Sequence, residues 1–297
     1  MKSKKTIVIC MFAVAFGLFL NACKKDSSST TSTTANEAAG VSVSTSATAS
    51  EMMYDDAFDI VNQSSEQNSL TVSSIGNTPT LDAINTNATG SYTTTAGATI
   101  TVVPANSSVF PKTITVDFGT GVTSATGITR KGQIIITLTG KIRVAGTVIT
   151  ATYNNYTVNG YKITGTYSLT PHIVANAGVN YNVTVSNGSI TFPSGDVATY
   201  SGTETFTQTA GIGTASITDD TYEITGNFSY SNTNGASISG TITTPLVKSA
   251  DCKDITSGII AFTYKSINGT LDFGAGTCDN LATVKFGLTT KTITLPR

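Results

Sequence analysis

The chain has 297 residues, of which 39% are hydrophobic and only 12% are charged, and its formal net charge is −1. Charged residues normally make up about a quarter of a globular domain, so threonine, serine, asparagine and glycine must solvate most of this surface. Lysine and arginine form no block outside the N-terminus, which excludes the basic patch of a nucleic-acid-binding protein. One histidine and four cysteines likewise exclude most histidine-based catalysis and any multi-cysteine metal cluster.

Residues 1–22 have the organisation of a secretion signal. Three lysines within the first five residues precede an apolar run of about fifteen residues, which is too short to span a membrane. The run ends in Leu-Asn-Ala-Cys, closing at Cys23, and this sequence resembles a bacterial lipobox. The resemblance implies cleavage before Cys23, a diacylglycerol group on its thiol and a further acyl chain, such as palmitate, on its new amine. The mature protein would then lie on a membrane through this lipid anchor without spanning it.

Residues 23–48 are rich in serine, threonine and alanine and show no apolar periodicity, so we predict a flexible, disordered, lipid-anchored tether. The next segment, 49–66, is predicted to be one short amphipathic helix, with acidic residues on its polar face. Its apolar residues recur at roughly helical spacing: Met53, Ala57, Phe58, Ile60 and Val61. We expect this helix to cover one end of a β core.

Residues 67–297 are predicted to form a β-rich domain. Apolar and polar residues alternate over 161–169 and 222–230, as expected for strands with one buried face. Asn-Gly dipeptides at 159, 187, 234 and 268 are typical of tight hairpin turns. No helical pattern separates the strands, which favours an all-β antiparallel meander, built as a sandwich or as an open barrel-like sheet. One domain of this size is reasonable, and a subdivision near residue 171 is the alternative.

Two short sequences recur within the β-rich domain. Tyr-Lys-Ile-Thr-Gly at 161–165 matches Tyr-Glu-Ile-Thr-Gly at 222–226, and Asp-Phe-Gly-x-Gly occurs at 117–121 and again at 272–276. With the lipobox and the acidic helix, these segments resemble those of Bacteroidetes outer-membrane and surface lipoproteins. That family has no established activity. The resemblance therefore implies an outer-membrane location, on the periplasmic face or at the cell surface, and a β-rich fold, but no reaction.

Cys252 and Cys278 remain after the signal and the lipidated cysteine are set aside. An even pair in an exported chain predicts a disulfide, which would close a loop of about 27 residues and stabilise the fold by roughly 3–4 kcal/mol. This disulfide would bring Asp251, Asp254 and Asp279 near one another. Carboxylates with loop carbonyls could hold Ca²⁺, which we keep as the one possible cofactor, although aspartate is also a common turn residue.

No catalytic constellation is visible in the sequence. The sequence contains no G-x-S-x-G motif with a nucleophile that His172 could activate as a base. We expect His172 to be a loop or strand-end residue. We therefore predict a non-enzymatic envelope protein that binds a ligand or a protein partner. The alternatives are a polysaccharide-acting hydrolase that uses an aspartate pair, such as Asp219 and Asp279, and a structural or adhesive surface protein whose threonine-rich sheets pack with other chains.

Overall fold

The computed structural model describes residues 27–69, 90–93, 97–106, 108–173, 178–214 and 219–296. Cys23 and the predicted signal peptide, 1–22, lie outside the described residues. Within them the chain forms one long helix, α1 (Ser27–Ser69), followed by strands only. The strands are β1 (Gly90–Thr93), β2 (Thr99–Val103), β3 (Lys112–Asp117), β4 (Val122–Thr123), β5 (Thr129–Leu138), β6 (Ile149–Val158), β7 (Tyr161–Ile173), β8 (Val179–Thr191), β9 (Val197–Ala210), β10 (Thr221–Asn232), β11 (Ser237–Ser249), β12 (Ser257–Tyr264), β13 (Ile267–Ala275), β14 (Leu281–Phe286) and β15 (Thr289–Thr294).

All the strands belong to one antiparallel sheet, in which each strand pairs with the next along the chain. The short β4 is the exception, because it pairs only with β5 and leaves β3 and β5 as neighbours. The predicted all-β meander is confirmed as a single open sheet with β1 and β15 at its two ends, and the sandwich alternative is wrong. Pro171 lies inside β7 opposite Tyr181, so the ladder runs through the position where a subdivision was considered.

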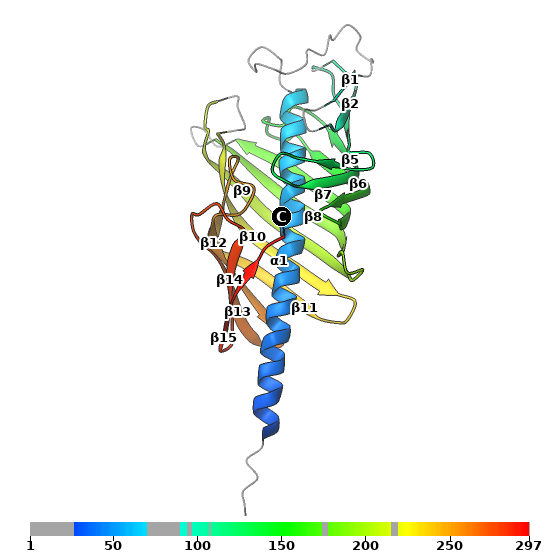
Figure 1. Ribbon diagram of the computed structural model, residues 1–297. Coiled ribbons are helices and arrows are strands. Elements are labelled where there is room, and N and C mark those ends of the chain that lie inside the picture. Colours follow the sequence, from blue (N-terminus) through cyan, green and yellow to red (C-terminus); the bar gives the residue numbers. More distant parts are fainter. Residues whose placement is uncertain are drawn as a thin grey trace, which may run out of the picture.

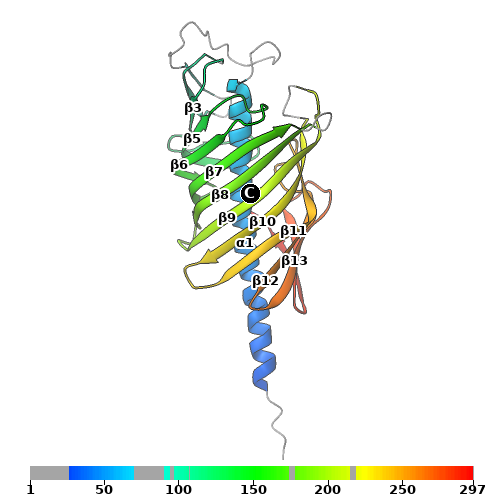
Figure 2. The same ribbon diagram turned by 180° about the vertical axis from the view of Figure 1, so that it is seen from behind.

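The sheet curls around α1, which runs along its concave face (Figure 1). Seen from behind, the strands cross the helix obliquely and cover its middle part, and one end of the helix extends past the sheet (Figure 2). The prediction that the helix covers one end of the β core is therefore wrong, since it lies along the whole trough. Phe58 is one of its buried apolar residues, and its ring stacks on the ring of Phe206 with the centroids 4.2 Å apart.

The helix is also much longer than the sequence pattern indicates, because residues 27–48 of the predicted tether belong to it. Several of these residues are buried, among them Val41, Val43 and Ala47. The serine and threonine hydroxyls that made this segment look like a tether donate to helix carbonyls, as Thr48 does to Ser44 over 2.9 Å. Since these hydroxyls need no water, the segment can be buried as a helix, which the prediction of a flexible tether overlooked.

The Tyr-x-Ile-Thr-Gly repeat marks two places where the sheet bends. Its glycines, Gly165 and Gly226, have φ values of +110° and +145°, and the strand register shifts at both. A Cβ on Gly226 would lie 2.3 Å from the Thr203 carbonyl oxygen, so no larger residue fits. Bulges of this kind bend and twist a strand. The repeat therefore recurs because β7 and β10 both carry a bulge that helps to curl the sheet.

Two of the four Asn-Gly dipeptides are turns, and two are not. Those at 159–160 and 234–235 connect β6 to β7 and β10 to β11, as predicted. The dipeptide at 187–188 lies at a bulge within β8, and the one at 268–269 lies within β13. The turn before β13 uses Lys265 and Ser266, both with positive φ, because the pairing of Tyr264 with Ile267 leaves only these two residues to reverse the chain.

Truncating Phe58 to alanine should lower the free energy of unfolding by about 3–5 kcal/mol, the usual range for a large buried aromatic side chain. Urea unfolding followed by circular dichroism measures this change. Leu288 is the matched control, since it is 95% exposed and its alanine variant should differ from the wild type by less than about 0.5 kcal/mol. A Phe58→Ala variant as stable as this control would show that α1 does not unfold together with the sheet.

Candidate functional site

The acidic residues of α1 face cations of the sheet rather than solvent alone. Asp56 pairs with Arg130 of β5, and Asp59 pairs with Lys248 of β11 at 3.0 Å. Further along the helix, Glu66 pairs with Arg143, which lies after β5 and also contacts Asp220 at 3.4 Å. Because each cation comes from a different part of the sheet, the pairs fix both the rotation and the axial position of the helix.

Not every acidic residue of α1 that contacts the sheet has a basic partner among the described residues. Glu51 of α1 and Glu204 of β9 lie close to each other, and only 3% and 8% of their surfaces are exposed. Burial, together with the nearby Asp55 carboxylate, raises the pKa of Glu204 to about 8. Burial and the neighbouring acids also raise the pKa of Glu51 well above its usual range. The two side chains therefore hold at least one proton between them at neutral pH.

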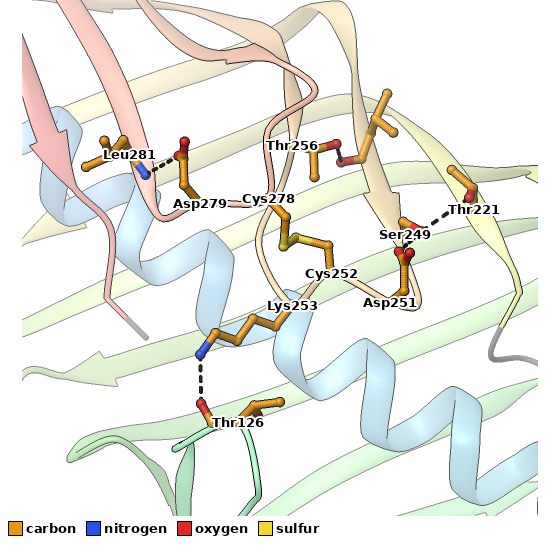
Figure 3. Close-up of a disulfide and its surroundings, with 11 residues drawn as sticks. Thr126, Thr221, Ser249, Asp251, Cys252, Lys253, Thr256, Cys278, Asp279 and Leu281 are labelled. Carbon is orange, nitrogen blue, oxygen red and sulfur yellow. Dashed lines mark hydrogen bonds between the residues drawn. A yellow bond between two sulfur atoms is a disulfide. The ribbon is translucent and has the colours of Figure 1, made fainter.

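The predicted disulfide between Cys252 and Cys278 is present. It fastens the loop of residues 250–256, which we call the clasp loop, to the loop that follows β13 (Figure 3). From the clasp loop, the Nζ atom of Lys253 donates a 2.8 Å hydrogen bond to the carbonyl of Thr126, in the turn between β4 and β5. The helix passes behind this contact in Figure 3. The clasp loop and the β4–β5 turn thus join two distant parts of the sheet in front of α1.

A cavity of about 290 Å³ lies between α1 and the clasp loop. Its walls also include the β4–β5 turn, the turn between β6 and β7, and Pro296 near the end of the chain. The lining combines aliphatic and aromatic side chains, such as Met52, Phe58 and Ile255, with aspartates and basic residues. The cavity therefore has the mixture of apolar surface and a few polar groups that is typical of small-molecule sites.

The structure does not bring the three calcium candidates, Asp251, Asp254 and Asp279, into one group of ligands. Among the described residues, the acidic and sulfur ligands that approach within 4.8 Å of one another near the disulfide are those of Cys252, Asp254 and Cys278. Both sulfurs are used in the disulfide, so one carboxylate remains, whereas Ca²⁺ takes six to eight oxygens. Asp251 accepts a hydrogen bond from Ser249, and Asp279 accepts one from the Leu281 amide on the other side of the disulfide (Figure 3).

The other residues singled out in the sequence are structural where the structure describes them. His172 lies on the exposed face of β7, with its Nε2 atom 2.9 Å from the Asn182 amide nitrogen. Neither Asp219 nor Asp279, the pair suggested for a hydrolase, lines the cavity. In both Asp-Phe-Gly repeats the aspartate accepts a hydrogen bond from the glycine amide, at 2.7 Å for Asp117 and 2.8 Å for Asp272. The first repeat reverses the chain after β3, and the second lies at the end of β13, so in both the aspartate caps a glycine near a strand end.

The sequence pattern did not reveal the basic partners of the helix or the cavity beside it. Arg130, Arg143 and Lys248 are far from α1 in the chain, and nothing in their local sequence indicates that they face it. Glu204 is buried, whereas the threonines next to it on β9 are on the more exposed face. An acidic residue at an inward-facing position of a strand was the one feature of the sequence that could have indicated this contact with the helix. No protein-family model matches the chain, and comparisons with curated proteins and with solved structures found no match either.

Stability should depend on pH through Glu204. Its folded pKa of about 8 lies above its ordinary value of 4.5, so the folded protein binds the extra proton. The contribution of this proton to the free energy of unfolding is complete below pH 4.5 and is lost as the pH rises to about 8. The loss is at most about 1.4 kcal/mol per pH unit for each proton released on unfolding. Urea unfolding between pH 5 and 8 measures how steeply the free energy of unfolding falls with pH.

Glu204→Gln should make this dependence on pH weaker. Glu223→Gln, on the exposed face of β10, is the control and should leave it unchanged. Equal slopes for the two variants would assign the pH dependence to other groups.

Proposed function

We propose that the protein is a lipid-anchored, non-enzymatic component of the outer membrane that binds a small ligand in the cavity between α1 and the clasp loop. The observation that carries the binding role is the cavity itself, with its apolar walls and its charged groups held in place by ion pairs. It lies where segments far apart in the sequence meet, and the disulfide fixes one wall. A site built in this way is preorganised, which favours binding.

The lipobox at Cys23 supports the membrane location. The described helix begins at Ser27, four residues after this cysteine. A helix of 43 residues is about 64 Å long at 1.5 Å per residue, and the part of α1 nearest its N-terminus extends past the sheet (Figure 1). None of the described helical sequence is long and apolar enough to cross a membrane. We infer that α1 is a stiff spacer that starts close to the lipid anchor and holds the sheet and its cavity away from the membrane surface.

Replacing Cys23 by serine should abolish incorporation of labelled palmitate and move the protein from the membrane fraction to the soluble fraction, because no thiol remains to carry the diacylglycerol. Cys10→Ser is the matched control, since Cys10 lies in the predicted signal and should leave both readouts unchanged. Palmitate label retained by the Cys23→Ser variant would contradict the proposed anchor.

The binding role is tested by filling the cavity. Gln63 is exposed on α1 and lines the cavity, so tryptophan in its place should occupy the ligand volume at little cost to folding. Native mass spectrometry of protein extracted gently from its own membranes should detect a bound small molecule on the wild type and on the control Leu288→Trp, but not on Gln63→Trp. The same bound mass on all three proteins would place the ligand elsewhere, and no bound mass on any of them would count against the proposed function.

A further inference from the structure

The cavity contains a buried acceptor that no protein group satisfies. Asn62 of α1 lines the cavity and is only 5% exposed. Its Nδ2 atom donates to the Tyr222 hydroxyl at 3.4 Å, but its Oδ1 atom has no hydrogen-bond partner. An unsatisfied buried acceptor typically costs about 1–3 kcal/mol. Because Asn62 lines the cavity, a hydrogen-bond donor on a bound ligand is the group that would satisfy this oxygen.

A second acceptor lies on the same side of the helix. Asp55 precedes Asn62 by seven residues, which is nearly two full turns, so both project from one face of α1 and are separated by about 10 Å along its axis. Asp55 also lines the cavity and is only 7% exposed. It takes part in none of the four ion pairs between described residues. Burial and the nearby Asp59 and Asp56 disfavour its charge, and the Lys248 ammonium, which is paired with Asp59, only partly offsets them.

The cations of the cavity are already engaged. Arg130 pairs with Asp56, Lys248 pairs with Asp59, and Lys253 donates to the Thr126 carbonyl. The lining holds five aspartates against three basic side chains, an excess of two negative charges. The protein therefore offers acceptors to a ligand and has no spare cation for an anion, while the methylene and aromatic surfaces of Met52, Met53 and Phe58 suit an aliphatic chain.

We propose that the cavity binds an aliphatic diamine or polyamine in an extended form, with one ammonium group at Asp55, a second at Asn62 and the intervening chain against the apolar wall. An ammonium group offers three donors and no acceptor, which matches a carboxylate and an amide carbonyl. Two positive charges balance the excess of two aspartates. This inference rests on the proposed ligand-binding function and adds the chemical class of the ligand.

The test compares ligands of one length and different charge. Isothermal titration calorimetry of the full chain in detergent, at pH 7.5 and low salt, uses 1,8-diaminooctane, 1,8-octanediol and suberate as probes. We expect the diamine to bind at least tenfold more tightly than the uncharged diol and the dianion not to bind. Asp55→Asn and Asn62→Leu should each weaken diamine binding at least tenfold. Asp196→Asn, at an exposed turn between β8 and β9, should bind as the wild type does.

Two results would overturn the inference. Diol or suberate binding as tight as that of the diamine would remove the role of the ammonium groups, and unchanged diamine binding by both the Asp55 and Asn62 variants would place the amine elsewhere. Absence of diamine binding would overturn it as well. The proposed function fails separately, since it requires the native ligand of the wild-type protein to be lost from Gln63→Trp whatever the class of that ligand.

Discussion

The structure depends on the burial of one helix in the concave face of an open sheet. A curled sheet whose end strands do not pair has an apolar inner surface, and α1 packs against it. The stacking of Phe58 on Phe206 is part of this contact. Because hydrophobic stabilisation is roughly proportional to the apolar area removed from water, the helix and the sheet depend on each other for stability.

The contact between α1 and the sheet is more polar than a typical core. Asp56, Asp59 and Glu66 form ion pairs with basic residues of the sheet and its loops, and two buried carboxyl groups, Glu51 and Glu204, lie close to each other. Buried ion pairs contribute little net stability, because desolvation offsets much of their attraction. Their effect here is positional, since they select one register of the helix in the trough. The cavity follows from that register, because it exists only where the clasp loop meets the face of α1 that carries Asp55 and Asn62.

Curvature of the sheet is the second requirement, and glycine provides it. Gly165 and Gly226 occupy bulges in which a side chain would collide with the neighbouring strand. Without such bulges the strands would form a flatter sheet, which could not reach around both sides of the helix. The curl brings the β4–β5 turn and the clasp loop together in front of α1, where Lys253 donates a hydrogen bond to the Thr126 carbonyl. The position of the cavity therefore depends on glycines that do not themselves line it.

The sequence by itself determined the strand pattern, the antiparallel meander and the disulfide between Cys252 and Cys278, because alternation, turn dipeptides and an even cysteine count are local or compositional signals. It did not determine the length of α1, since serine and threonine look like linker residues until their hydroxyls are satisfied by the helix backbone. It also left the calcium candidates, the basic partners of the helix and the cavity undecided. These depend on how far the sheet curls and on which residues, distant in the chain, then face each other, and only the tertiary structure decides that geometry.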